Sequence, residues 1–174
     1  MKKNQYKILV TGVAGFLGSH LSEELSNLGH KIIGIDNMIG GYKDNIPKEI
    51  EFHNIDCCDF DKIKNIMKGV DIVYHCAATA HEGLSVFSPF EITKNNYLAS
   101  VSIFSAAVNE KVKRIIFCSS MARYGAQDYP FNENMKPKPV DPYAISKVAS
   151  EQVLINLCEL NKIEWVIAVP HNII

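Results

Sequence analysis

A tyrosine and a lysine four residues apart, near the start of a predicted helix, form a possible proton-transfer pair. Tyr143 is the only one of the seven tyrosines with a lysine four positions on, at Lys147. This spacing places both side chains on one helix face. Free tyrosine has a pKa of about 10 and is a poor base, but a nearby ammonium lowers that pKa by stabilising the phenolate. We therefore expect acid–base chemistry at an alcohol or carbonyl carbon; an exposed surface pair is the alternative.

A pair of serines lies where a third member of such a site is expected. Ser119 ends the apolar run RIIFCS, which predicts a buried strand, and Ser120 follows it. Doubly wound sheets bind their ligands at the carboxyl ends of the strands. A hydroxyl there can hydrogen-bond a substrate oxygen, although a serine that caps a turn fits the same pattern.

Three glycines between the first predicted strand and the first predicted helix indicate a phosphate-binding turn. Gly12, Gly15 and Gly18 form GxxGxxG, a variant of the dinucleotide-binding fingerprint. Such a turn lets the backbone approach a pyrophosphate, which the positive end of the helix attracts. Asp36 ends the second predicted strand, where a carboxylate accepts hydrogen bonds from ribose hydroxyls and repels a 2′-phosphate. We predict NAD rather than NADP; a plain glycine-rich turn and a solvated loop carboxylate are the alternatives.

Apolar runs alternate along the chain with longer stretches of helical periodicity, and these elements must position the residues above. Short continuous apolar runs predict strands at 7–11, 31–36, 51–55, 71–76, 114–119 and 164–170. Apolar spacings of three and four predict helices at 16–28, 59–68, 90–110 and 143–161. This alternation predicts an α/β fold, with a parallel sheet between helices. Binding residues are expected in the loops 37–50, 77–88 and 121–141.

The composition indicates one globular domain and argues against nucleic-acid and membrane partners. The 174 residues carry a formal net charge of −1, and no apolar run is long enough for a signal peptide or a membrane span. A nucleic-acid-binding domain usually has a basic stripe. The five cysteines include no CxxC pair and the six histidines no HExxH motif. We therefore expect a cytoplasmic protein with reduced thiols and no metal site.

The order of these motifs resembles the extended short-chain dehydrogenase/reductases, the NAD-dependent epimerases and dehydratases of nucleotide sugars. The resemblance covers nearly the whole chain, in TGVAGFLG at 11–18, HCAA at 75–78, CSSMARYG at 118–125 and PYAISK at 142–147. The stretch from Ser85 to Asn96 looks most like that of UDP-glucose 4-epimerases. The resemblance implies a Rossmann-like doubly wound sheet of six strands, in the order 3-2-1-4-5-6, with helices on both faces. It also implies that residues 1–174 are a single NAD-binding domain.

The resemblance assigns site residues one by one. It implies that Ser120, Tyr143 and Lys147 are catalytic, and that Ser120, Tyr143 and Asn172 contact substrate. The residues that it implies for the cofactor NAD are Gly12, Gly15, Phe16, Leu17, Gly18, Asp36, Asn37, Asp56, Cys57, Ala77, Ala78, Asn96, Tyr143, Lys147 and His171.

The implied reaction is C4 epimerisation of a UDP-sugar through a 4-keto intermediate. Dehydratases of the family place acidic residues just after the catalytic serine or threonine, where this chain has Met121 and Ala122. Epimerisation is therefore favoured over water elimination. A dehydratase, dehydrogenase or reductase of the same family is one alternative, and a non-catalytic NAD-binding module is another.

Three further expectations concern the surface and the end of the chain. The apolar surface of the helix at 90–110 is broader than one sheet contact requires. The resemblance implies that this helix forms a homodimer contact together with the helix at 143–161, and deeper burial within one subunit is the alternative. Family members continue well beyond the equivalent of Ile174, so we expect the C-terminal substrate-binding lobe to be absent and this fragment alone to be inactive.

Single residues outside these motifs allow more than one interpretation. Arg123 stands where the family is commonly apolar, and it fits a surface position, a contact to substrate or a contact to a partner subunit. His81 follows HCAATA and fits either a sugar contact or an ordinary loop position. His75, within a predicted strand, is expected to be a core histidine.

Overall fold

Six parallel strands form one sheet in the order β3-β2-β1-β4-β5-β6, which confirms the predicted doubly wound topology. The structure, a computed structural model, describes residues 5–172. The strands are β1 (Lys7–Thr11), β2 (Lys31–Asp36), β3 (Glu51–Asn54), β4 (Ile72–His75), β5 (Arg114–Cys118) and β6 (Glu164–Ala168). Most of the side chains of β1 and β2 are buried, as their continuous apolar runs predict.

The order of the strands reverses beside β1, and this places a crevice at one edge of the sheet. Thr11, the last residue of β1, lies between Ile35 of β2 and His75 of β4. The chain leaves β1 toward β2 and leaves β4 toward β5, so the two connections diverge above this point. Ligands of open α/β sheets bind at such a switch point, beyond the carboxyl ends of the strands.

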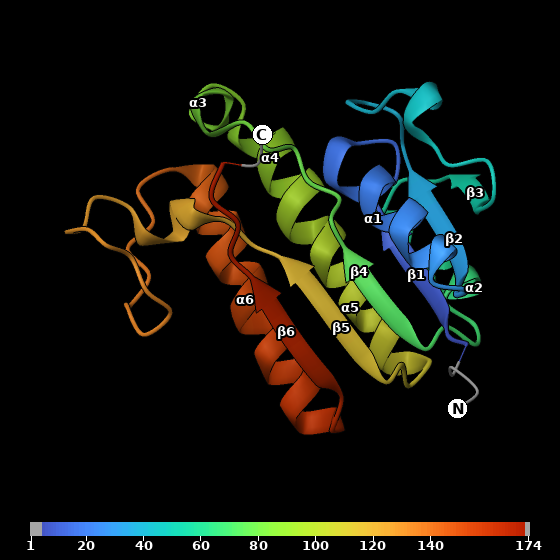
Figure 1. Cartoon of the computed structure of the whole chain (residues 1–174). Coiled ribbons are helices and arrows are strands. Elements are labelled where there is room, and N and C mark those ends of the chain that lie inside the picture. The colour runs from blue at the N-terminus through green and yellow to red at the C-terminus, as the bar shows by residue number, and fades with distance from the viewer. Residues whose placement is uncertain (1–4, 173–174) are drawn as a thin grey trace.

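Helices lie on both faces of the sheet, as predicted, but on one face a helix covers only β1 and β2 (Figure 1). On one face, α1 (Phe16–Asn27) contributes Leu25 to a small core with Ile8 and Val10. On the other face lie α2 (Phe60–Ile66), α5 (Ala99–Asn109) and α6 (Pro142–Asn161). These three helices share the larger core, which includes Phe104 and Leu154. The strands β1 and β2, which flank the glycine turn, are therefore packed from both sides, whereas most residues of β6 are exposed.

The prediction of one regular helix at 90–110 is wrong. It consists of α4 (Pro89–Thr93), a π-helical turn η2 (Lys94–Leu98) and α5. The wide turn directs Asn96 inward, where its side chain is almost fully buried. A π turn inside a helix often marks a functional site, and its extra residue leaves no mark in the apolar spacing.

Three short elements lie within the predicted loops, in stretches whose residues show no periodic pattern. They are η1 (Lys43–Asn45), α3 (Glu82–Ser85) and η3 (Met121–Tyr124). The other predicted elements differ from the observed ones only at their ends, by up to two residues. No helix among residues 5–172 has both the length and the apolar character that crossing a membrane requires.

Candidate active site

A cavity of about 760 Å³ lies along the carboxyl edge of the sheet and collects the predicted site residues. Its size suits a cofactor-sized ligand. The predicted residues that line it are Gly12, Gly15, Phe16, Leu17, Gly18, Asp36, Asn37, Asp56, Cys57, Ala77, Ala78, Ser120, Tyr143, Lys147, His171 and Asn172. Only Asn96 of the predicted set is not in the wall of this cavity.

The turn from β1 into α1 is shaped by glycines that no larger residue could replace. Gly12 has a φ of +73°, and a Cβ there would lie 2.9 Å from the backbone of Ala77. A Cβ on Gly18 would overlap with the Gly12 carbonyl oxygen. The turn therefore packs tightly against both the segment that follows β4 and the first turn of α1. The early N–H groups of α1, at Phe16 and Leu17, have no carbonyl within the helix to bind and lie at the cavity wall.

Asp36 holds the same turn in place. One of its carboxylate oxygens accepts a hydrogen bond of 3.0 Å from the Ala14 N–H, and the other accepts one of 2.8 Å from the Met38 N–H. The alternative of a merely solvated loop carboxylate is therefore wrong. Asp36 both stabilises the glycine turn and faces the cavity.

A neighbouring acid, Asp56, closes this end of the cavity. Burial opposes its ionisation, but hydrogen bonds from the Cys58 N–H and the Asn37 amide outweigh burial and lower its pKa. Two carboxylates, Asp36 and Asp56, thus line the end of the cavity farthest from Tyr143 along the strand order. A negatively charged wall suits ribose hydroxyls and opposes a further phosphate.

A chain of buried polar side chains links β1 to the π-helical turn. The Thr11 hydroxyl accepts hydrogen bonds from the Cys76 and Ala77 N–H groups and lies 2.8 Å from His75 Nδ1. His75 Nε2 lies 2.9 Å from the Ser100 hydroxyl, which donates to the Asn96 carbonyl. The expectation of a core histidine is thus confirmed. Burial lowers the pKa of His75 to about 3, so the ring is neutral.

Asn96 acts at the back of the cavity wall. Its side-chain oxygen accepts a hydrogen bond of 2.7 Å from the Thr79 N–H, and its amide donates to the Thr79 carbonyl. This anchors the segment after β4, in which Ala77 and Ala78 line the cavity. The buried Asn96 side chain therefore supports the cavity wall from behind and does not face the cavity itself.

Ser120, Tyr143 and Lys147 meet at the other end of the cavity and are all buried. The Lys147 ammonium donates a hydrogen bond of 2.7 Å to the Cys118 carbonyl, and it lies 5.9 Å from the centroid of the Tyr143 ring. Burial lowers the pKa of Lys147 to about 8. Tyr143 and Lys147 are both buried, so the alternative of an exposed surface pair is wrong. Ser120 does cap a turn, because its hydroxyl accepts a hydrogen bond from the Ala122 N–H at the start of η3, and it also lines the cavity.

The pKa of Tyr143 departs from the expectation. Burial raises it, and the hydrogen bond with Ser120, which lowers it, does not compensate. The negative charges of Glu82 and Asp141 add to the upward shift. The expected lowering by Lys147 is wrong in this structure, because the ammonium is directed at the Cys118 carbonyl. Tyr143 is therefore a phenol at neutral pH.

Several residues of the site were missed by the sequence reasoning. Cys76 and Cys118 line the cavity with their sulfur atoms 3.5 Å apart, and their strand positions, one residue after His75 and Phe117, could have revealed the pair. The hydrogen bond between the two thiols lowers the pKa of Cys118. Glu151 is buried on α6, two turns after Tyr143 and one after Lys147, a spacing that signals a shared face.

His81 lies at the cavity, whereas Arg123 does not. His81 precedes α3 and lies in the cavity wall. The surface position for Arg123 is wrong, because its side chain is only 14% exposed and pairs with Glu151. Neither Arg123 nor Glu151 lines the cavity. Among the described residues, no three side chains of the metal-binding types converge on one point.

Comparison with known proteins points in one direction. A sequence model of the NAD-dependent epimerase/dehydratase family matches residues 8–174. A putative UDP-glucose 4-epimerase of Methanocaldococcus jannaschii is 36% identical over 163 residues, which are 92% of this chain and 53% of that protein.

Solved structures agree with this match. A Thermus thermophilus UDP-glucose 4-epimerase in complex with NAD superimposes with a TM-score of 0.89 and 31% identity, over 92% of this chain and 53% of that one. A UDP-N-acetylglucosamine 4-epimerase of Methanobrevibacter ruminantium, in complex with UDP-N-acetylmuramic acid, has a TM-score of 0.89 and 32% identity, over 95% and 54%. The chain thus spans about half the length of the relatives that it matches.

Proposed function

The chain belongs to the NAD-dependent epimerase/dehydratase family, and from this premise we propose that it is the cofactor-binding part of an NAD-dependent nucleotide-sugar 4-epimerase. The proposed substrate is a UDP-sugar, and the reaction passes through a 4-keto sugar. The observation that supports this most strongly is that one cavity joins the glycine turn at β1 to Ser120, Tyr143 and Lys147.

The residues of the cavity fit NAD. The missing side chains at Gly12, Gly15 and Gly18 leave a bare turn at the positive end of α1, where a pyrophosphate is stabilised. Asp36 faces the position expected for the adenosine ribose, and Asn37, Asp56 and Cys57 line the adjoining wall. Ala77, Ala78 and His171 line the remaining wall of the cavity. When bound, NAD supplies hydride transfer to and from the sugar carbon.

In the proposed reaction, residues of this chain transfer the proton of the sugar C4 hydroxyl. We assign Tyr143 as the group that takes the proton from the C4 hydroxyl and returns it, with Ser120 hydrogen-bonded to the same sugar oxygen. Burial keeps the resting phenol protonated by raising its pKa. Tyr143 must therefore first release its own proton to solvent and act as a phenolate, and this needs positive charge near the ring in the working complex. We propose that Lys147 supplies this charge and binds the nicotinamide ribose in the working complex, in contrast to this structure, where the Cys118 carbonyl holds its ammonium.

The proposal is tested by following UDP-galactose and UDP-glucose by NMR with the complete protein. We expect interconversion without net consumption of NAD. Replacement Tyr143→Phe removes the proton-transfer group and should lower kcat by about 100-fold or more, while NAD binding is retained. Tyr129→Phe, a change at an exposed tyrosine outside the cavity, should leave kcat within about twofold of the wild type.

Other outcomes would contradict this assignment. Undiminished turnover in Tyr143→Phe would exclude the tyrosine. A dehydrated product or net reduction of NAD would indicate another reaction of the family. NAD binding without any turnover of sugar nucleotides by the complete protein would indicate a binding module.

We also propose that the protein is a cytoplasmic homodimer. The five cysteines are all free thiols, which fits a reducing compartment. A groove between η2 and α6, lined by Tyr97, Ile145 and Ala149 among others, offers an apolar surface to a second copy. Ile145 is 54% exposed at this groove.

We further propose that residues 1–174 form one NAD-binding domain. In this proposal the lobe that selects the sugar lies outside these residues, so residues 1–174 are inactive alone.

A further inference from the structure

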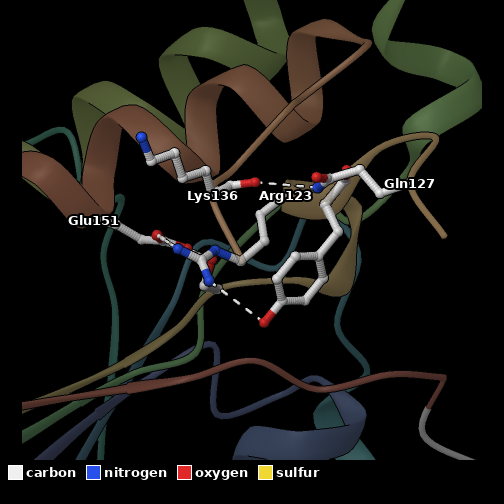
Figure 2. A network of polar contacts seen from close by, with 6 residues as sticks. Arg123, Gln127, Lys136 and Glu151 are labelled. Carbon is white, nitrogen blue, oxygen red and sulfur yellow. Dashed lines mark hydrogen bonds and ion pairs between the residues drawn. The ribbon is translucent and has the colours of Figure 1, made fainter. Parts of the chain in front are cut away.

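Arg123 turns inward from η3 toward α6 instead of facing solvent (Figure 2). Its Nη2 atom lies 2.9 Å from Glu151 Oε2, and the two side chains are 14% and 4% exposed. Removing one partner of a buried ion pair leaves an uncompensated charge, which is strongly unfavourable. The ion pair therefore holds η3 against α6 in the folded protein.

The second oxygen of Glu151 extends this connection to the end of β5. Glu151 Oε1 accepts a hydrogen bond from the Ser119 hydroxyl. The Ser119 N–H donates a hydrogen bond of 2.8 Å to the Ala168 carbonyl of β6. One carboxylate thus joins α6 and β5, next to Ser120 in the chain and on the helix face that carries Lys147.

The backbone of η3 passes this constraint to Ser120. The Arg123 N–H donates to the Ser120 carbonyl at 3.2 Å, and the Ser120 hydroxyl accepts a hydrogen bond of 3.2 Å from the Ala122 N–H. The Lys138 N–H donates to the Arg123 carbonyl at 2.8 Å. The residue whose guanidinium is held by Glu151 is therefore part of the turn that presents the Ser120 hydroxyl.

From this geometry we propose that Arg123 and Glu151 are positioning residues. Their ion pair fixes the Ser120 turn relative to Tyr143 and Lys147 on α6, so that serine and tyrosine reach the same substrate oxygen. The proposal rests on the proposed function for its catalytic consequence. Neither residue lines the cavity, so the effect passes through Ser120 and not through contact with ligand.

The test compares Arg123→Met, Arg123→Lys and a matched control in the complete protein. Gln127→Ala is the control, because Gln127 bonds the Tyr124 and Lys136 carbonyls of the same loop but does not contact Glu151 (Figure 2). Arg123→Met should lower kcat by about tenfold, with the KM for the sugar nucleotide and the Kd for NAD within about twofold. Arg123→Lys should recover part of kcat, and Gln127→Ala should stay within about twofold of the wild type. An unchanged kcat in Arg123→Met, or equal losses in the control, would overturn the proposal.

Hydrogen–deuterium exchange separates this proposal from the proposed function. Backbone amides at 120–123 should exchange faster in Arg123→Met and not in Gln127→Ala, whether or not the wild type turns over. Unchanged exchange would overturn the positioning role, and an inactive wild type would overturn only the function. If Arg123→Met does not fold, Glu151→Gln replaces it, because glutamine keeps the shape of the glutamate side chain. The same tenfold loss of kcat and the same faster exchange at 120–123 are expected from this variant.

Discussion

His75 is a single residue on which several parts of the site depend. It is fully buried between Thr11 and Ser100 and stacks against Phe117. The Thr11 hydroxyl accepts two N–H groups and has its own proton left for Nδ1, so the ring donates from Nε2 to Ser100. A protonated ring would have to donate from both nitrogens, and the Thr11 hydroxyl, which already accepts two N–H groups, cannot accept a third.

The neutral state of His75 predicts an acid dependence of stability. Its pKa is about 3 in the folded protein against 6.5 for the free side chain, so between these values the unfolded state binds one more proton. The free energy of unfolding therefore falls as the pH decreases from about 6.5 to 3, with a slope of about 1.4 kcal/mol per pH unit from this residue. Urea unfolding across this range measures it. His75→Gln should be less stable at pH 7 but lose this slope, whereas His20→Gln, at an exposed histidine, should keep it.

At the scale of elements, the junction between β1 and α1 carries the cofactor proposal. Gly18→Ala directs a methyl group at the Gly12 carbonyl oxygen, which must move the helix N-terminus away from the turn. We expect a loss of about 1–3 kcal/mol in the free energy of unfolding and at least a tenfold rise in the Kd for NAD, measured by calorimetric titration.

The chain offers a matched glycine for comparison. A Cβ on Gly83, in α3, would have no atom within 4 Å, and the backbone there is ordinary. Gly83→Ala should therefore change stability by no more than about 0.5 kcal/mol and leave NAD binding intact. Equal NAD affinity in Gly18→Ala and wild type would contradict the role assigned to this turn.

The strands and the glycine turn were predictable because their signals are local. Ile8, Leu9 and Val10 form a continuous apolar run, and all three are buried in the central strand of the sheet. The π turn at Lys94–Leu98 and the short helix η3 were not predictable, since they depend on tertiary hydrogen bonds such as that of Asn96 with Thr79. Glu151 was missed for a similar reason, because a glutamate in a long helix is usually solvated unless a partner such as Arg123 meets it.

The whole molecule exposes apolar surface that a second copy would cover. Ile145→Glu places a charge in the groove between η2 and α6, whereas Leu160→Glu places the same charge at an exposed leucine of α6 outside that groove. Light scattering of the complete protein should give a dimer for the wild type and Leu160→Glu, and a monomer for Ile145→Glu. A monomeric wild type would exclude the proposed dimer.

In the whole molecule, one cavity extends from the glycine turn to Ser120, Tyr143 and Lys147, and the proposed epimerase returns to C4 the same hydride that it removes. The most direct measurement uses the complete protein with UDP-galactose that carries deuterium at C4. We expect UDP-glucose that retains the deuterium at C4, with no accumulation of reduced NAD. Loss of the deuterium to solvent, or reduced NAD formed in proportion to product, would contradict it.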